Sequence, residues 1–298
     1  MTKYRLSELD MIFLSYDEGD VDLNWERVKE FNPFAKRVHG VKGFDRAHKL
    51  CAELAETDRF IIIDGDNWLH DSWIDPSADD VYINDDGVET ACFSFSSINN
   101  INGLVYGNGG VKVWNKNTLL DTNTHEAGNS TDFCWAIPYY QVNKTLSISV
   151  QNATDYQAWR SGFREAVKMT QDEGRARENL AHTWHAIYDK NLSRLNVWCS
   201  VGRDVKNGIW SILGARQAVY EMMSSDFNQQ NINDYDWFKI KWENRWDETN
   251  GFGPDKHAHD LRERLLSDYN FYIPELDPKQ SAWFKQTYIS PPRNGLMK

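Results

Sequence analysis

The sequence predicts an α/β protein, in which helices flank a mixed β-sheet and a mostly helical C-terminal extension follows. Between residues 9 and 66, short apolar runs alternate with helical patterns in the order β-α-β-α-β. This order favours a largely parallel sheet with helices on its faces. The last run, Phe60 to Ile63, is apolar at every position, as in a strand buried on both faces. From Tyr156 onward, apolar residues recur at helical spacing instead.

The first four elements are short and clearly bounded. Leu9 to Ser15 is the first expected strand, and it leads into a polar loop made of Tyr16, Asp17, Glu18 and Gly19. Asp22 is expected to cap a helix that ends near Phe31, and residues 35–39 form the second strand. Asp45 then begins the helix with the most regular apolar stripe, made of Ala47, Leu50, Cys51, Leu54 and Ala55.

Two carboxylates separated by one glycine, Asp64 and Asp66, directly follow the buried strand. In open α/β sheets, ligands bind beyond the carboxyl ends of the strands. Mg²⁺ or Mn²⁺ at such a site takes one or two carboxylates and completes its coordination with waters and substrate phosphates. Asp64 and Asp66 are therefore candidate metal ligands in a site for a nucleotide diphosphate. Short Asp-x-Asp sequences are common, and the alternative is an acidic turn that only caps a strand.

The chain after Asp66 continues with strands and then with helices. Further strands are expected at residues 81–84, 90–95, 111–114 and 146–150, with a turn at 85–87 and one helical turn at 118–121. Helices are expected along the stripe from Tyr156 to Val167, from Arg177 to Lys190 and from Ile209 to Met223. Residues 226–298 indicate short helices and loops packed on the main body, with a loose tail at residues 291–292.

Composition limits the classes of function. The chain of 298 residues carries a formal net charge of -11, which argues against a surface coated in positive charge for non-specific nucleic-acid binding. The N-terminus has no apolar signal core and no stretch approaches a membrane span, so we expect a cytoplasmic protein without a membrane partner. The four cysteines lack ligand spacing and are expected to be buried thiols: Cys51, Cys92, Cys134 and Cys199.

Several stretches of the chain together resemble one known family. They are residues 10–18 (DMIFLSYDE), 36–43 (KRVHGVKG), 64–66 (DGD), 104–112 (LVYGNGGVK), 159–165 (WRSGFRE) and 198–202 (WCSVG). In this order they resemble the GT-A-fold glycosyltransferases of tailed bacteriophages. Some of these, arabinosyltransferases among them, glycosylate 5-hydroxymethylcytosine in phage DNA. The resemblance implies a Rossmann-like GT-A domain at residues 1–220, an extension packed on it at residues 221–298, and a location in the host cytoplasm.

The resemblance also implies roles for individual residues. Asp64 and Asp66 would hold Mn²⁺ or Mg²⁺ on the diphosphate of a UDP-sugar. The donor site would comprise Tyr16 and Asp17 at the base and ribose, His39, Lys42 and His48 in the donor pocket, Gly109 and Lys112 beside the donor sugar and acceptor, and Arg160 and Arg164 on the same face. In GT-A enzymes a histidine is often a third metal ligand, and the candidates here are His182, His185, His257 and His259. For His182 and His185 the alternative is a structural role, because Asp64 and Asp66 already provide carboxylates. The implied reaction moves a pentose or hexose to 5-hydroxymethylcytosine or a related modified pyrimidine in DNA.

Glycosyl transfer needs a neutralised leaving diphosphate, which a metal and a cation such as Lys42 provide, and a base for the acceptor hydroxyl. Asp132 is the candidate base, because the flanking Phe133 and Trp135 would desolvate it and raise its pKa. An ordinary loop aspartate is the alternative. A transfer that retains the sugar's configuration would require no such base, and the sequence does not distinguish the two outcomes.

The acceptor and the activity both have alternatives. A local basic surface for DNA could lie on Lys36, Arg37, Lys42, Arg46 and Lys49, or on Arg160, Arg164, Lys168, Arg175 and Arg177, although each set could be a solvated face. The acidic net charge slightly favours a glycan or a small molecule as acceptor. A protein that binds a nucleotide-sugar without turnover is a third interpretation, against which the intact pair Asp64 and Asp66 argues.

Overall fold

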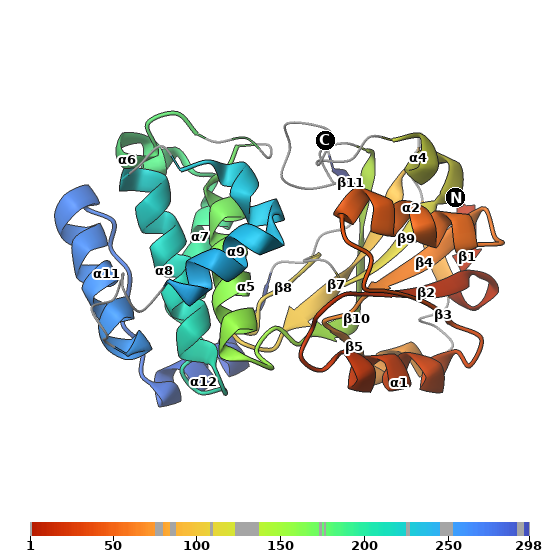
Figure 1. Ribbon diagram of the computed structural model, residues 1–298, viewed down its shortest axis with the longest axis horizontal. Coiled ribbons are helices and arrows are strands. Elements are labelled where there is room, and N and C mark those ends of the chain that lie inside the picture. Colours follow the sequence, from red (N-terminus) through yellow and green to blue (C-terminus); the bar gives the residue numbers. More distant parts are fainter. Residues whose placement is uncertain are drawn as a thin grey trace.

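The structure, a computed structural model, describes residues 2–74, 80–83, 88–107, 110–122, 137–172, 175, 177–224, 227–244, 253–290 and 295–297. Its first half is a β-sheet covered by helices, and its second half is a group of helices beside that sheet (Figure 1). The predicted α/β class, a mixed sheet flanked by helices with a helical C-terminal part, is therefore confirmed. Within these residues, no helix is long and apolar enough to cross a membrane.

The strands form one large and one small sheet. Their bounds are β1 (Thr2–Arg5), β2 (Asp10–Ser15), β3 (Lys36–His39), β4 (Arg59–Asp64), β5 (Asn67–Leu69), β6 (Asp80–Ile83), β7 (Cys92–Asn99), β8 (Val105–Tyr106), β9 (Val111–Asn115), β10 (Tyr139–Ser149) and β11 (Gly295–Met297). In the described chain, the large sheet has the order β11-β10-β7-β9-β4-β2-β3, with β5 beside β10 and β8 beside β7, while β1 pairs with β6. β2 is parallel to β3 and β4, but β9 is antiparallel to β4 and β7, so the sheet is mixed.

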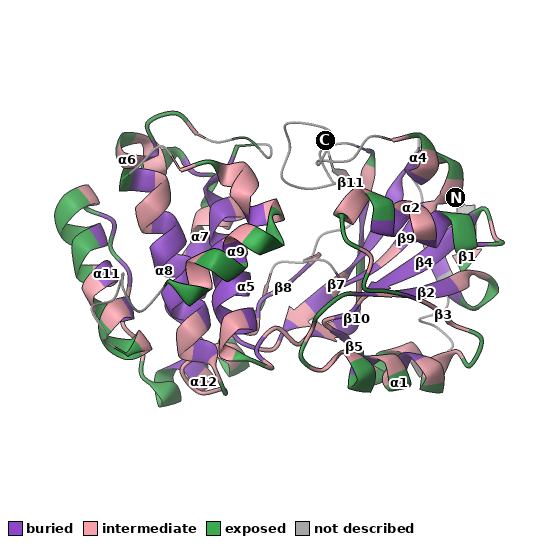
Figure 2. Cartoon of the chain, in the orientation of Figure 1, coloured by how far each residue is buried: buried purple, intermediate pink, exposed green. Residues whose placement is uncertain are grey.

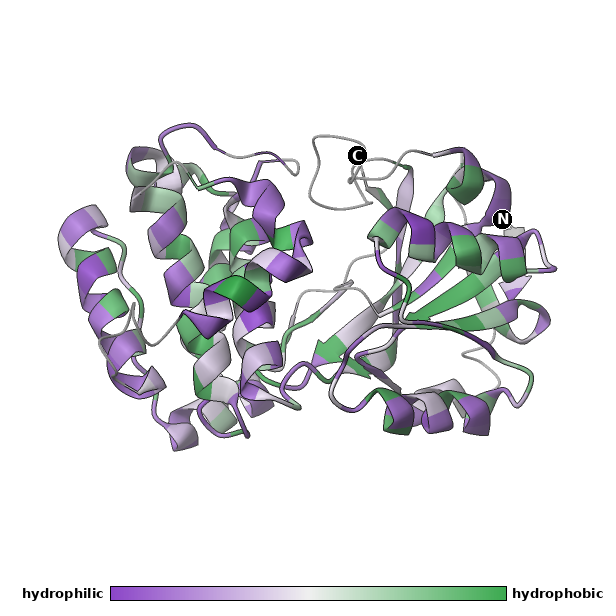
Figure 3. Ribbon diagram, viewed as in Figure 1, coloured by the Kyte–Doolittle hydropathy of each residue, from purple (hydrophilic) through white to green (hydrophobic). Residues whose placement is uncertain are grey.

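Alternate side chains of β4 pack against helices on opposite faces of the sheet. Ile61 and Ile63 lie in one cluster with residues of α1 (Val21–Phe31), whereas Phe60 and Ile62 lie in another with residues of α2 (Phe44–Leu54). All four are at most 1% exposed. The strand is thus buried on both faces, as its apolar sequence predicts, and the central strands are the apolar, buried part of this half (Figures 2 and 3).

The second half of the chain is helical from Asp155 onward. The remaining helices are α4 (Lys116–Asp121), α5 (Asp155–Thr170), α6 (Leu180–Thr183), α7 (Asp189–Trp198), α8 (Gly208–Ser224), α9 (Tyr235–Glu243), α11 (Pro254–Tyr269) and α12 (Pro278–Thr287), with 3₁₀ turns η1 (Leu6–Glu8), η2 (Asp71–Ile74), η4 (Trp184–Ala186) and η5 (Gln229–Asn233). α5 and α8 cross closely, since a Cβ on Gly162 would lie 2.0 Å from the carbonyl oxygen of Ser211. Trp159 and Phe163 of α5 are buried, so this aromatic stripe faces the core.

Three helix predictions need correction. Residues 177–190 do not form one helix, because Asn179 is left-handed with φ of 52° and Ile187 is extended between η4 and α7. The helix expected at Asp22 begins at Val21 after Asp20, so Asp22 lies in its first turn. In the C-terminal part, α11 has 16 residues, longer than the short helices expected there.

The change from sheet to helices and the end of the GT-A domain inferred from the resemblance are two different positions in the chain. Residue 220 lies inside α8, whereas the change from sheet to helices occurs between β10 and α5. The chain's last strand, β11, returns to the first half and pairs with β10. Cys51, Cys92 and Cys199 are buried, as expected, and within the described residues none of them forms a disulfide. Cys134, the turn at 85–87 and the tail at 291–292 lie outside the described residues.

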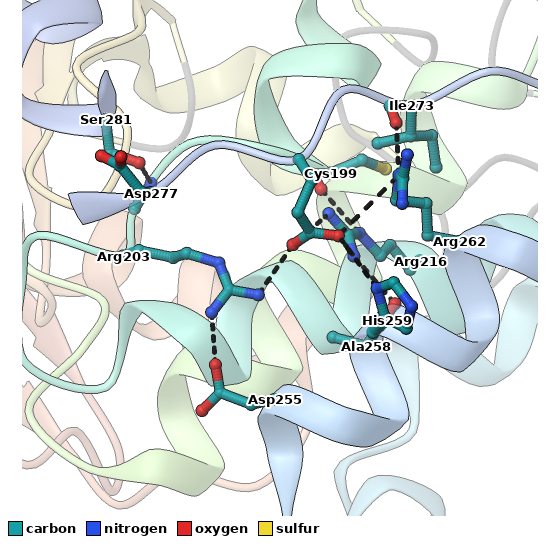
Figure 4. Close-up of polar contacts among 12 residues, drawn as sticks. Cys199, Arg203, Arg216, Asp255, Ala258, His259, Arg262, Ile273, Asp277 and Ser281 are labelled. Atoms are coloured by element: carbon teal, nitrogen blue, oxygen red, sulfur yellow. Dashed lines mark hydrogen bonds and ion pairs between the residues drawn. The ribbon is translucent and has the colours of Figure 1, made fainter. Parts of the chain in front are cut away.

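A cluster of charged side chains joins α11 to the rest of the helical half. Glu275, in the segment after α11, accepts hydrogen bonds from Arg203 at 2.7 Å and from Arg216 at 3.2 Å. Arg262 and His259 of α11 lie 3.8 Å and 3.7 Å from the same carboxylate. Figure 4 shows the three arginines and the histidine pointing toward one another. Since Arg216 is fully buried, Glu275 supplies the negative charge that its guanidinium requires.

Candidate functional site

The order of strands creates a topological switch point between β2 and β4. From β2 the chain passes through α1 to β3 on one side, and then through α2 to β4 on the other. The loops that follow β2 and β4 therefore diverge at the carboxyl end of the sheet, which is where open α/β sheets bind ligands. Asn24 of α1 donates a hydrogen bond of 2.9 Å to the carbonyl oxygen of Gly65, which ties the helix after the first loop to the second loop.

Three carboxylates meet at this point. Asp64 is the last residue of β4, and Asp66 follows two positions later, after Gly65. Glu18, from the loop after β2, packs against the backbone of Gly65: a Cβ there would lie 2.6 Å from the Glu18 Oε2 atom. The same Cβ would lie 2.8 Å from the Cβ atom of Ser15, which cannot rotate away, so glycine is favoured at position 65. Glu18 is a site residue that sequence analysis did not single out.

Burial and mutual repulsion raise the pKa values of these carboxyl groups. Burial raises the pKa of Asp64 to about 7, with the charge of Lys112 opposing the shift and the charges of Asp66 and Glu18 adding to it. Burial also raises the pKa of Asp66, against a hydrogen bond from Gln151. The pKa of Glu18 rises through burial as well, and the charge of Asp66 adds to that rise. The cluster is electrostatically unfavourable by itself, and a cation would relieve it.

The acidic pair suits a divalent cation that is held mainly by a nucleotide. Within the described parts of the chain, no group of three or more His, Cys, Asp or Glu residues is arranged to hold a metal ion. Mg²⁺ and Mn²⁺ bound with a diphosphate need only one or two carboxylates from the protein, so Asp64 and Asp66 fit such an ion. The Asp64 side chain retains 31% of its exposure, which leaves it accessible from solvent.

The four candidate histidines lie in the helical half of the molecule. His182 and His185 belong to α6 and η4, and His257 and His259 to α11. Both α6 and α11 lie on the side of this half that is away from the sheet (Figure 1). The structure therefore does not bring these histidines together with Asp64 and Asp66.

Cations from both halves face the acidic pair. The Nζ atom of Lys112, on β9, lies 3.6 Å from Oδ2 of Asp64. Arg160 and Arg164 of α5 act on Asp66 by charge and oppose the rise of its pKa. Arg160 is only 8% exposed, and its Nη1 atom makes no hydrogen bond with any described residue. A buried guanidinium nitrogen without an acceptor is suited to an anionic ligand.

Helix α9 adds residues that the sequence did not indicate. The ring centroid of Tyr235 lies 4.5 Å from the guanidinium carbon of Arg160, and Arg164 donates a hydrogen bond of 3.3 Å to its hydroxyl. The same ring lies 6.3 Å from the ring of Tyr16, in the loop after β2. A segment of the expected extension thus reaches the acidic site and contacts a residue predicted to bind the nucleotide.

The other predicted donor-site residues take different positions. Asp17 lies beside the site, with Oδ1 at 3.7 Å from Nη1 of Arg160. His39 is exposed, and its Nδ1 lies 2.9 Å from the Ser15 hydroxyl. Lys42 forms an ion pair of 2.6 Å with Asp236 of α9, which links the loop after β3 to the helical half.

Of the three remaining candidates, only His48 lies among the described residues. His48 is 3% exposed and packs between the rings of Phe44 and Trp114, with centroids at 4.0 Å and 5.7 Å. It therefore belongs to the packing between α2 and the sheet. Gly109 and Asp132, the candidates for the donor loop and the catalytic base, lie outside the described residues.

Comparison with known protein families and with curated protein sequences finds no match to this chain. The assignment of a function therefore depends on the geometry of the site and on the sequence motifs.

Replacing Asp64 by Asn is expected to stabilise the metal-free protein at alkaline pH. Because the folded state raises the pKa of Asp64 to about 7, its ionised form costs stability above that pH, and the cost shrinks as pH falls toward the ordinary value. We expect a gain in unfolding free energy on the order of 1–2 kcal/mol at about pH 8 in EDTA, and a smaller gain at about pH 5. Urea unfolding of both proteins at both pH values measures this gain in unfolding free energy.

The matched control is Asp58→Asn, just before the opposite end of β4, where the side chain is exposed. It should leave stability unchanged at both pH values. A loss of stability in Asp64→Asn at alkaline pH would show that its ion pair with Lys112 outweighs the repulsion within the cluster.

Proposed function

We propose that this protein is a metal-dependent glycosyltransferase of the GT-A type, which moves a sugar from a UDP-sugar to an acceptor. The observation that carries the proposal is the crowded pair Asp64 and Asp66 at the topological switch point, faced by the buried Arg160. Carboxylates for a cation and a guanidinium for an anion are both needed to hold a diphosphate at one position. The motifs that resemble those of the phage enzymes support the same activity.

The acidic pair and the cations that face it would have different roles in the transfer. Asp64 and Asp66 would hold Mn²⁺ or Mg²⁺, which when bound neutralises charge on the leaving diphosphate. Arg160 and Lys112 would stabilise the negative charge that grows on the diphosphate as the sugar leaves. Their positions on α5 and β9 support a diphosphate bound between the two halves.

The nucleoside end of the donor would lie at the mouth of the same site. Tyr16 and Tyr235 present partly exposed aromatic rings there, suited to stacking with a base. Asp17 pairs with Arg160, but its side chain is 51% exposed and would accept hydrogen bonds from the ribose hydroxyls. The Lys42–Asp236 ion pair joins the loop after β3 to α9, which supports a nucleotide enclosed by both halves.

For the acceptor we propose 5-hydroxymethylcytosine or a related modified pyrimidine in phage DNA, and the support for it is the resemblance of the motifs. The enzyme would have to turn the modified base out of the duplex to bring its hydroxyl to the donor sugar. Asp132 is the proposed base for this hydroxyl. A pentose and a hexose donor both fit the proposal, because only a few contacts in the pocket distinguish them.

A glycan or a small molecule is the second candidate acceptor. The observation that favours it is the formal net charge of -11, since an acidic protein repels the phosphates of DNA except at a local basic surface.

A mass-spectrometric nucleoside assay tests the proposal. The protein is incubated with Mn²⁺, a panel of UDP-sugars, and duplex DNA that contains 5-hydroxymethylcytosine or only unmodified cytosine. We expect a mass gain on the modified nucleoside alone, and the gain identifies a pentose or a hexose. UDP release from one donor without a mass gain would support the glycosyltransferase but not the DNA acceptor. Neither a mass gain nor UDP release from any donor would contradict the proposed activity.

A further inference from the structure

Side-chain amides hold both oxygen atoms of Asp66. Nδ2 of Asn67 donates to Oδ1 at 2.7 Å, and Nε2 of Gln151 donates to Oδ2 at 2.8 Å. Two N–H groups on one carboxylate favour its ionised form and restrict its rotation. Asp64 is held differently, since its Oδ2 faces the Nζ atom of Lys112 at 3.6 Å. The two candidate metal ligands are therefore not equivalent.

Buried serines fix the orientation of Asn67. Asn67 is fully buried, and its Oδ1 atom accepts from the hydroxyls of Ser147 at 2.9 Å, Ser97 at 3.3 Å and Ser149 at 3.4 Å. An ionised carboxylate can only accept, so Asp66 requires the Nδ2 side of the amide, while hydroxyls can donate to the oxygen side. The hydroxyls and the carboxylate thus select the same orientation of the amide.

The pairing of β5 with β10 brings the second amide to the same carboxylate. Asn67 lies opposite Ser149, and the N–H of Val150 donates to the carbonyl oxygen of Asp66 at 2.7 Å. Gln151 follows directly, and its Oε1 atom accepts from Nδ2 of Asn99 at 3.2 Å. Because that bond holds the oxygen side of the Gln151 amide, its Nε2 side faces Asp66.

We propose that Asn67 and Gln151 are positioning residues that hold Asp66 in one orientation as the fixed ligand of the divalent cation. Asp64, paired with Lys112, is then the ligand that adjusts when the cation binds. The inference rests on the proposed metal-dependent function. Groups that orient a metal ligand through hydrogen bonds typically contribute about 10–100-fold to metal affinity.

Gln151→Met tests the proposal without placing a new charge at the site. The thioether fills nearly the same space but donates no hydrogen bond. With UDP present, a Mn²⁺ titration followed by electron paramagnetic resonance should show a Kd raised about 10–100-fold, and the melting temperature should change little. The rate of UDP release should recover at high Mn²⁺ concentration, since the defect lies in the affinity for the cation.

Gln157→Met is the matched control, because Gln157 donates to the carbonyl oxygen of Val150 nearby and not to Asp66. It should leave Mn²⁺ affinity unchanged. If Gln151→Met binds Mn²⁺ as the unmodified protein does, whether or not its melting temperature falls, Gln151 is structural and the inference is wrong. If the unmodified protein binds no Mn²⁺ with or without UDP, the proposed metal-dependent function itself fails, and the inference fails with it.

Discussion

Asp66→Asn is expected to reduce the rate of sugar transfer, or of UDP release, by about 10³-fold at saturating donor. The substitution removes one of the two hydrogen bonds, from Asn67 or from Gln151, because an amide has a single acceptor oxygen. It keeps the size of the side chain and removes the charge that is proposed to bind the cation. The loss should therefore appear without unfolding. Release of UDP, measured over a range of Mn²⁺ concentrations, tests the expectation.

Asp64→Asn should also reduce the rate of sugar transfer or of UDP release, although it is expected to stabilise the metal-free fold. Activity and stability would then change in opposite directions, as at sites where function maintains an unfavourable cluster of charges. Asp58→Asn, just before β4 and at the end of the strand remote from the pair, should retain full activity. If transfer survives unchanged in both Asp64→Asn and Asp66→Asn, the metal-dependent account is wrong.

Removing the carboxylate of Glu275 should cost the largest amount of stability that the structure predicts for one side chain. Glu275→Ala leaves the buried Arg216 without its charged partner, and breaking such a pair costs about 3–5 kcal/mol. It also removes the ion pair between Arg203 and the same carboxylate. Urea unfolding of the two proteins measures the loss.

The contribution of Glu275 should depend on pH. Burial alone would raise the pKa of Glu275, but Arg216 and Arg203 hold it below its ordinary value. The stabilisation is therefore complete above the ordinary pKa of a glutamate and is lost as pH falls through the lowered pKa of Glu275.

The exposed Glu263 is the control, because its pair with Arg262 lies at the surface. Glu263→Gln should change stability by less than about 1 kcal/mol. Equal effects of the two substitutions would contradict this role.

The parts of the fold that could be predicted are those specified locally. Ile61 and Ile63 face α1 while Phe60 and Ile62 face α2, so four consecutive apolar residues indicate a strand buried on both faces. The same strand places Asp64 at its carboxyl end, which is why the acidic pair could be placed from the sequence. The apolar spacing from residue 177 to 190 was misleading, because Asn179 and Ile187 interrupt the helix without a proline or a glycine to mark the breaks.

The parts of the site that could not be predicted depend on contacts between distant segments. Glu18 reaches Gly65 because β2 and β4 are neighbours, and Gln151 reaches Asp66 because β10 pairs with β5. Tyr235 joins the site only because α9 packs beside α5. Single polar residues such as these carry no periodic signal, so only the three-dimensional arrangement reveals them.

The binding of UDP with and without Mn²⁺, measured by isothermal titration calorimetry, tests the central claim most directly. The claim is that Asp64 and Asp66 bind a nucleotide diphosphate through a divalent cation. We expect UDP to bind in Mn²⁺, to bind at least about tenfold more weakly in EDTA, and to lose this dependence in Asp66→Asn. Equal binding of UDP in Mn²⁺ and in EDTA, or no binding in either, would contradict the claim.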